Sequence, residues 1–507
     1  MTPVCRALDR FMPSFLSNLF KLTSGTVIAQ ATTILLIPVV TRIYPPAFFG
    51  VNQLFLSIAT VLLVISTFSY HLAVMVTEKD EDSMNLLVLC VLCLLGVAAT
   101  SGVILVVFGD WFASIFNTPL IADYFIWLPF FVIFSSLFTV LNEWLSRKVR
   151  YSIIAKSTVT NSIASRTLQI GGGLIYISPL GLILGSVVGA GLANLVLLRG
   201  LKEDIALLKK VTSRRIKELA LEYRQFMFYS TPGALANSMS WELPAFMLAY
   251  FFNSTIVGYY SLAIMAVRMP MMIVGTSIMQ VFFQKASEER IQTGGVQNVV
   301  HEVHTRLISV GIFPFVAFTI IAEDLFTFIF GANWLPAGTY AMILAPWFFA
   351  VFIFSPISSL FGVLNRQRAY FFFEIMTLCT WSLLFIAGGT FHDPVTALVL
   401  FSIGGVLLWG LKCVYLIKES GAGYRGSINS LTRHLALSII ISIPLIIAVY
   451  MGIPFLFLLA VAGITAVAYY LLIFFTDTLI RQEVLAMFRG SISPEHIKWM
   501  ERLGLFR

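Results

Sequence analysis

The chain alternates between long apolar segments and short polar ones along almost its whole length. Segments of about 20 or more apolar residues are long enough to cross the hydrocarbon core of a bilayer as α-helices. We expect about fourteen such spans, at residues 16–41, 47–76, 84–108, 121–147, 151–177, 179–201, 222–251, 254–284, 303–321, 337–364, 367–390, 393–418, 432–450 and 453–476. The pattern therefore predicts an all-α, polytopic membrane protein.

Lys and Arg residues are concentrated in every second polar segment. They lie in both tails, at Lys79, at 147–150, in the connector near 199–224, at 285–306, at 366–368 and at 418–433, whereas the segments that alternate with these contain none, with Arg42 as the exception. Short loops that stay on the cytoplasmic side carry the basic excess. We therefore expect both termini to be cytoplasmic, and Arg42 to lie on the outer side.

Composition agrees with a membrane protein and excludes several other classes. Of 507 residues, 58% are hydrophobic and 11% are charged, with a mean hydropathy of +0.90, whereas soluble domains carry about 25% charged residues. The net charge of +8 is spread over loops that would face anionic lipid headgroups, which argues against nucleic-acid binding. No metal-spaced cluster, phosphate loop or nucleophile elbow occurs, so we expect neither an enzyme nor a cofactor or metal site.

The two halves of the chain resemble one another. Three short matches recur in the same order, at shifts of 208, 214 and about 219 residues: Phe49-Gly50 with Val257-Gly258, 110–116 with 324–330, and Arg147…Tyr151 with Arg366…Tyr370. Each repeat holds six spans, so the copies should run in the same direction, as parallel repeats do.

This repeat predicts the domain organisation. We expect a six-helix bundle at 1–201, a connector at 202–221, a second six-helix bundle at 222–418, two additional transmembrane helices at 419–480 and a cytoplasmic tail at 481–507. The connector is charged but periodic, and its apolar residues can share one helical face. It is typical of an amphipathic helix on the cytoplasmic surface.

Two arginines lie in the middle of predicted spans and are the main candidates for substrate binding. Arg268 should face Thr60 across a cleft between the halves, because the 208-residue shift superposes them. Arg166 forms a polar stripe with Ser162 and Gln169. A mid-membrane Arg costs about 2.5–3.5 kcal/mol on insertion scales, so it requires water, an anionic ligand or a structural ion pair. Arg42 can meet a phosphate or simply snorkel.

Other polar residues are candidates for lining the cleft or for ion coupling. Thr60 and His71 are expected on one face of the span at 47–76, and Gln30 on span one, where helix–helix hydrogen bonding would explain it equally well. Glu242 and Glu374 can pair with an arginine or take up a proton. His71 can titrate near neutral pH, or serve only as a hydrogen-bonded packing residue.

Several segments are similar to a known family. The run from Pro38 to Gly50, continuing with Leu54-Phe-Leu-Ser-Ile58, closely resembles the start of Wzx-type polysaccharide-biosynthesis flippases. The segment 70–86 resembles the next segment of that family, and 179–185 is similar to its sixth helix. His71 departs from the family pattern, because many relatives have Glu there.

The resemblance implies a member of the superfamily that also contains drug/cation antiporters and lipid II flippases. Such flippases move an undecaprenyl-diphosphate-linked oligosaccharide across the bacterial inner membrane. The resemblance also implies alternating access, possible coupling to a proton or sodium gradient, and a polysaccharide polymerase and chain-length regulator as partners. The cationic cleft agrees with an anionic cargo.

Three alternatives remain open at this stage. A cation-coupled multidrug antiporter of the same fold would favour an acidic, aromatic cavity. A polysaccharide polymerase or ligase should carry a long outer loop with Arg and His, which this chain lacks. A scaffold that transports nothing would share the fold but not the activity.

Overall fold

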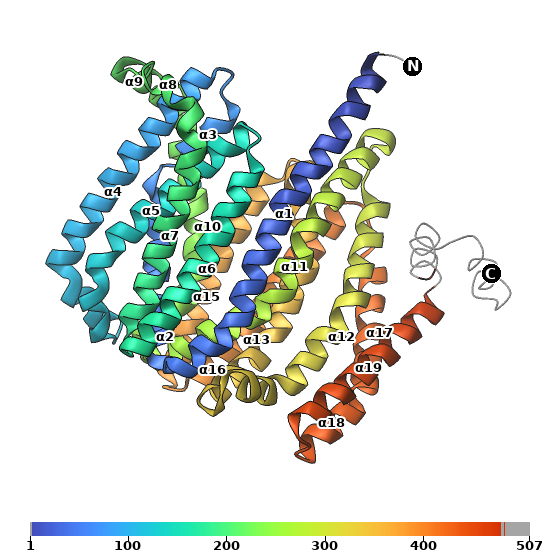
Figure 1. Ribbon diagram of the computed structural model, residues 1–507. Helices are drawn as coiled ribbons and strands as arrows, with labels where there is room; N and C mark the ends of the chain where they lie inside the picture. Colours follow the sequence, from blue (N-terminus) through green and yellow to red (C-terminus); the bar gives the residue numbers. More distant parts are fainter. Residues whose placement is uncertain (1–2, 478–480, 482–507) are drawn as a thin grey trace. The chain divides into compact units, whose positions relative to one another are not determined.

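The protein is built of helices. The computed structural model describes residues 3–477 and residue 481, and those residues contain no β-strand. The α-helices are α1 (Pro3–Ile43), α2 (Pro46–Ser66), α3 (Tyr70–Val76), α4 (Asp80–Ile115), α5 (Leu128–Arg147), α6 (Tyr151–Ile175), α7 (Pro179–Leu201), α8 (Ile205–Leu208), α9 (Ser213–Glu222), α10 (Thr231–Phe251), α11 (Ser254–Thr293), α12 (Gln297–Phe330), α13 (Leu335–Phe354), α14 (Leu360–Val363), α15 (Gln367–Thr390), α16 (Pro394–Glu419), α17 (Tyr424–Ile441), α18 (Ile443–Tyr450) and α19 (Phe455–Thr476). Figure 1 shows the long helices as extended rods.

The membrane spans agree with the predicted pattern. Among the described residues, ten helical segments are long and apolar enough to cross a bilayer, and the pair α17 and α18, bent by 44°, adds an eleventh. Helices α6, α10 and α11, which have 25, 21 and 40 residues, lie at three further expected spans but are not among these segments, so the expected number of fourteen remains a prediction. The prediction of an all-α, polytopic membrane protein is confirmed.

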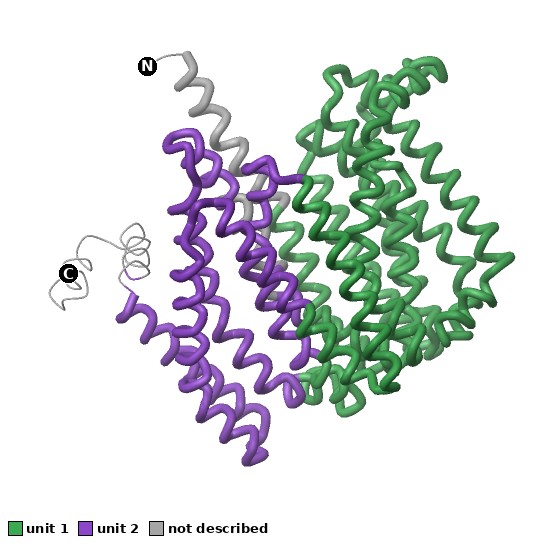
Figure 2. Tube along the Cα trace, turned by 180° about the vertical axis from the view of Figure 1, so that it is seen from behind, with its two compact units in different colours: residues 1–266, 326–340, 368–404 green, residues 267–325, 341–367, 405–507 purple. Residues whose placement is uncertain are grey.

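The chain divides into two compact units, which are coloured separately in Figure 2. Unit 1 comprises residues 1–266, 326–340 and 368–404, and unit 2 comprises 267–325, 341–367 and 405–507. The predicted division into bundles at 1–201 and 222–418 with two extra helices remains a prediction. The predicted tail at 481–507 lies outside the described residues apart from Arg481.

The second predicted span is broken. We expected one helix over 47–76, but α2 ends at Ser66, and α3 begins at Tyr70. Between them, Phe68 and Ser69 adopt left-handed backbone angles, with φ of 46° and 57°. Because the helical register is interrupted there, the polar face that we expected to run from α2 to His71 ends with α2.

The connector, which belongs to unit 1, packs against other helices of that unit. Arg215 on α9 donates from Nε to Asp82 Oδ1 over 2.7 Å, and the backbone N–H of Thr212 donates to Asn85 Oδ1 over 3.1 Å. Leu219, which is 1% exposed, enters a hydrophobic cluster that contains Trp144. Asp82 belongs to the acidic first turn of α4, where negative charge at a helix N-terminus is favourable in itself, and Asn85 follows one turn later. Leu219 is therefore covered by α3, α4 and α5, whereas Ile205 and Leu208 of the connector are 51% and 40% exposed. The expected position of the connector at the cytoplasmic membrane surface remains a prediction.

Candidate functional site

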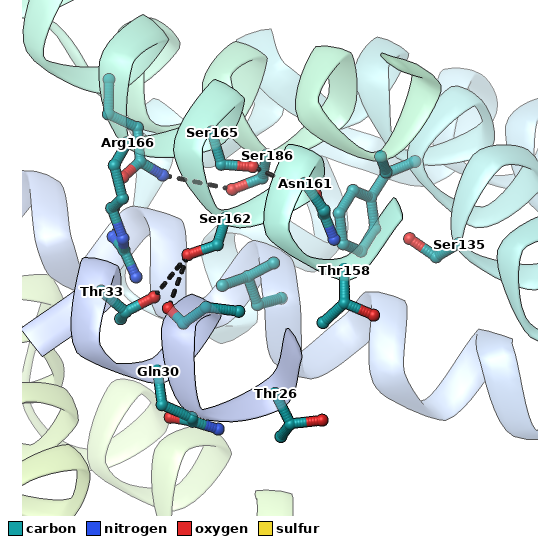
Figure 3. Close-up of a pocket in the computed structure, with 15 residues that line it drawn as sticks. Thr26, Gln30, Thr33, Ser135, Thr158, Asn161, Ser162, Ser165, Arg166 and Ser186 are labelled. Carbon is teal, nitrogen blue, oxygen red and sulfur yellow. Dashed lines mark hydrogen bonds between the residues drawn. The ribbon is translucent and has the colours of Figure 1, made fainter. Parts of the chain in front are cut away.

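A polar pocket of about 330 Å³ lies inside unit 1, among α1, α5, α6 and α7. Its described lining is dominated by hydroxyl and amide side chains, and Arg166 is the one charged residue among them (Figure 3). The polar lining residues are Thr26, Gln30, Thr33, Ser135, Thr158, Asn161, Ser162, Ser165, Arg166, Gln169 and Ser186. A pocket of this character within a membrane-spanning bundle is suited to a hydrophilic ligand.

The polar side of α6 produces this pocket. Thr158, Asn161, Ser162 and Ser165 succeed one another at steps of three, one and three residues, so they share one face of the helix. The facing helix α7 is glycine-rich, and a Cβ at Gly189 would lie 2.0 Å from Ser165 Oγ. Only a residue without a side chain allows α6 and α7 to approach closely enough to bury these groups between them.

Arg166 is half-buried and retains most of its hydrogen-bonding capacity. Its Nη1 donates to Gln169 Oε1 over 2.7 Å, and Gln169 Nε2 in turn donates to the carbonyl oxygen of Leu182 over 3.1 Å. Among the residues whose side chains the structure describes, no carboxylate lies within 4.0 Å of its guanidinium nitrogens. A guanidinium has five N–H donors. Arg166 is therefore held in place by a neutral amide while its positive charge remains available to a ligand.

The wall of the pocket opposite Arg166 is formed by α1. Ser162 Oγ donates to the carbonyl oxygen of Ala29 over 2.7 Å and lies 3.1 Å from Thr33 Oγ1. Gln30 lines the same wall, and the Arg166 side chain extends toward α1 (Figure 3). The structure thus brings together three of the predicted residues, Arg166, Gln169 and Gln30.

A second polar group connects α2 with α10, also within unit 1. Ser57 is fully buried, and its Oγ donates to Glu242 Oε2 over 2.6 Å. Gln53 Nε2 donates to the same serine over 3.1 Å. Glu374 on α15 accepts a hydrogen bond of 3.3 Å from Asn237 of α10. Both predicted acids therefore lie in hydrogen-bonded polar surroundings on neighbouring helices.

The remaining predicted residues lie elsewhere. Thr60 donates to the carbonyl oxygen of Leu56 over 2.8 Å and does not line the pocket. His71 Nδ1 lies 2.7 Å from Thr67 Oγ1. Arg42 is exposed at the end of α1 and donates to the carbonyl oxygen of Phe328 over 3.3 Å. Arg268 is an exposed residue of α11 that belongs to unit 2, so its expected position across a cleft from Thr60 remains a prediction.

Sequence reasoning missed five hydrophilic residues of the pocket: Ser135, Thr158, Asn161, Ser165 and Ser186. Five hydroxyl or amide residues within eight positions, at 158–165, are unusual in a membrane span. If the polar stripe around Arg166 is extended toward the N-terminus of α6, it includes Thr158, Asn161 and Ser165, which are three of these five residues. Ser186 is a single serine and Ser135 has only Ser136 beside it, both in apolar surroundings, so they gave no comparable signal.

Comparison with known proteins agrees with this architecture. Residues 39–339 match the family described as polysaccharide biosynthesis protein. A comparison with curated proteins gives no match. Because the family match spans more than half of the chain, the protein belongs to this family.

Solved structures with the same fold are transporters. The lipid II flippase MurJ, in an inward closed conformation, has a TM-score of 0.67 at 12% identity, over 89% of this chain and 98% of MurJ. An outward-facing multidrug resistance MATE family transporter of the MOP superfamily has a TM-score of 0.54 at 12% identity, over 80% of this chain and 96% of that one. A MOP superfamily transporter from Pyrococcus furiosus has a TM-score of 0.50 at 11% identity, over 79% and 93% of the two chains.

Fold and family together define the class of protein. The fold is that of MOP superfamily transporters, and the family is one of polysaccharide biosynthesis. The protein is therefore a multi-pass membrane protein of the polysaccharide biosynthesis family, with the fold of these transporters.

Proposed function

We propose that the protein is a flippase for undecaprenyl-diphosphate-linked oligosaccharide, the repeat unit of an O-antigen, capsule or exopolysaccharide, in the bacterial inner membrane. The family match and the likeness to the lipid II flippase support this assignment. The main support is the environment of Arg166. This cation lies on α6, within an expected membrane span, and has no carboxylate partner among the described side chains.

The pocket chemistry suits such a cargo. A guanidinium can donate two parallel hydrogen bonds to phosphate oxygens, which makes Arg166 a suitable contact for the diphosphate. The hydroxyl and amide groups around it can exchange hydrogen bonds with sugar hydroxyls. A diphosphate and its sugars cannot cross hydrocarbon unaided, because their polar groups would lose their water without replacement. The pocket supplies that replacement.

We propose roles for the other predicted residues on the same basis. Arg268 is a second contact for the diphosphate during alternating access, and Arg42 meets it at the outer side. Glu242 takes up the coupling proton, because protonation of a carboxylate held by the Ser57 hydroxyl would change its hydrogen bonding to α2. In this scheme both termini are cytoplasmic, and a polysaccharide polymerase and chain-length regulator act on the delivered repeat unit.

Surface polysaccharide in cells tests the proposal. In a strain that lacks its own copy of the gene, Arg166→Gln should lower surface polymer at least about tenfold, because loss of a charged contact to a buried anion costs about 2–5 kcal/mol. Arg268→Ala should act in the same direction. The matched control is Lys156→Gln, which removes a cation from the same helix outside the pocket. Membrane levels of each variant are measured in parallel.

The same strains separate the flippase from the multidrug antiporter. Wild-type polymer in the Arg166→Gln strain, with the variant present at normal level, would contradict the proposal. Active efflux of an organic cation that does not depend on Arg166 would favour the antiporter instead.

A further inference from the structure

A second hydrophilic pocket, of about 360 Å³, lies in unit 2 at the N-terminal end of α12. Its walls are the first turns of α12, one side of α17 and Asp477 directly after α19, and all nine of its lining residues are polar. Helices α17 and α19 lie outside the segment that matches the family, which ends at residue 339. The proposed flipping of an oligosaccharide gives this pocket no role.

The walls are fixed by contacts among these helices. His304 Nδ1 on α12 lies 3.1 Å from Ser427 Oγ on α17, and the Tyr469 hydroxyl on α19 donates to the carbonyl oxygen of Ser309 over 2.8 Å. Three helices are thus joined around the pocket by buried hydrogen bonds. These hydrogen bonds hold the walls of the pocket in place.

Both positively and negatively charged side chains line the pocket. Arg306 Nη2 pairs with Glu302 Oε1 at 2.6 Å, and the Asp477 carboxylate lines the same space. His434 is only 8% exposed, and its Nδ1 is buried without a hydrogen-bond partner among the residues that the structure describes. The His434 side chain lines the pocket, so its imidazole can donate an N–H to an anionic group of a ligand there.

The pocket lies at the boundary between the apolar and polar parts of these helices. Helix α12 has 34 residues, more than the roughly 20 that cross the hydrocarbon core, so its first turns extend beyond that core. The apolar span of α19 ends at Thr476, one residue before Asp477. Exposed apolar side chains lie close to the lining residues on the same helices: Val310 follows Ser309, Leu435 follows His434, and Leu472 precedes Asp477 by five residues. This is the level of lipid headgroups, with acyl chains below.

We propose that the pocket binds the headgroup of a phospholipid that carries a phosphodiester and a primary ammonium, as in phosphatidylethanolamine. Arg306 and His434 contact the phosphate, and the carboxylates of Glu302 and Asp477 accept hydrogen bonds from the ammonium. A phosphatidylcholine headgroup has no N–H to donate. A phosphatidylglycerol headgroup has no positive charge for the two carboxylates. Mixed charge at headgroup depth therefore selects the amino lipid over both.

The first test uses the wild-type, full-length protein. It is delipidated in detergent and titrated with lipids of identical acyl chains: phosphatidylethanolamine, its N-methyl and N,N-dimethyl forms, phosphatidylcholine and phosphatidylglycerol. Thermal unfolding reports binding. Half-saturation should need about tenfold less phosphatidylethanolamine than phosphatidylcholine or phosphatidylglycerol, and should weaken stepwise with each methyl group, since charge-assisted hydrogen bonds are lost one by one.

Three results would overturn the proposal. They are equal binding of all five lipids, a preference for phosphatidylglycerol, and a full effect of soluble phosphoethanolamine at equal concentration, which would identify a free metabolite as the ligand.

A second test uses variants. Glu302→Gln combined with Asp477→Asn should reduce the preference for phosphatidylethanolamine over phosphatidylcholine to about one. Glu288→Gln, an acid of α11 in the same unit but outside the pocket, should leave it unchanged. A preference that survives the double substitution would show that these acids do not recognise the ammonium.

Discussion

Gly50 on α2 and Gly258 on α11 pack backbone against backbone. A Cβ on Gly50 would lie 1.6 Å from the carbonyl oxygen of Ser254 and 3.0 Å from the nitrogen of Gly258. A Cβ on Gly258 would lie 1.9 Å from the carbonyl oxygen of Pro46. The sequence repeat superposes these two glycines at a shift of 208 residues. Two positions that the predicted repeat superposes therefore touch, which is expected of residues near the axis of a parallel repeat.

This contact predicts the effect of adding a single methyl group. Gly50→Ala and Gly258→Ala should each destabilise the protein by about 1–3 kcal/mol, because the clash is with backbone atoms that cannot rotate away. Thermal unfolding of purified variants measures this. Gly96→Ala on α4 is the control, because no described atom lies within 4 Å of its Cβ position and alanine favours a helix. Equal stability of all three variants would disprove the close approach.

Glu242 is predicted to couple transport to protons. Glu242→Gln keeps an acceptor for the Ser57 hydroxyl but cannot bind and release a proton. Flipping in vesicles should then lose most of its acceleration by an imposed pH gradient while keeping a basal rate. Glu143→Gln on α5, which lies in neither polar group, is the comparison. A full response in the Glu242→Gln variant would exclude it as the coupling residue.

The ion pair that fastens the connector can be measured by a double-mutant cycle. Arg215 contacts both carboxylate oxygens of Asp82, at 2.7 and 2.9 Å, with 38% and 19% of the two side chains exposed. We expect a coupling energy of about 0.5–1 kcal/mol from Asp82→Asn, Arg215→Gln and the double variant. The measurement is thermal unfolding at low salt, and added salt should reduce the coupling. Purely additive effects would mean that the pair contributes nothing.

Asp393 caps α16 and predicts a pH dependence. Its Oδ2 accepts hydrogen bonds from the Thr396 hydroxyl at 2.6 Å and backbone N–H at 2.9 Å, and these bonds lower the pKa of the carboxyl below its ordinary value of 3.8. A lowered folded-state pKa means that this contribution is complete above the unfolded-state pKa and is lost as pH falls through the folded one. Asp393→Ala should cost about 1 kcal/mol at pH 7 in thermal unfolding, and clearly less near pH 3. A stability difference between the wild type and Asp393→Ala that does not change with pH would contradict the claim that the ionised carboxylate caps α16.

Much of the fold was predictable because apolar length and loop charge are strong signals in a membrane protein. The break between α2 and α3 was not predictable, because Phe68 and Ser69 adopt left-handed backbone angles and no glycine or proline marks the position in the sequence. The packing of the connector was also hidden. Its amphipathic pattern does not indicate that Leu219 packs among α3, α4 and α5 or that Arg215 pairs with Asp82 at the start of α4.

The site was predictable in part for a similar reason. Arg166 and Gln169 stood out because charged and amide groups are costly in hydrocarbon. The neutral hydroxyl groups beside them are tolerated in many membrane helices, since such a group can bond to the carbonyl oxygen four residues earlier, as Thr158 does with Ile154 at 3.0 Å. Their place in a pocket depends on the glycines of α7, which no pattern within α6 reveals.

The most direct test of the account is flipping by purified protein in vesicles. A fluorescent undecaprenyl-diphosphate-linked sugar is incorporated, and its accessibility to an added reagent is measured over time. We expect the wild type and Lys156→Gln to move the lipid at similar rates, Arg166→Lys to be slower, and Arg166→Gln to be slower than wild type by at least about tenfold. An unchanged rate in the Arg166→Gln variant would contradict the central claim that this guanidinium binds the diphosphate.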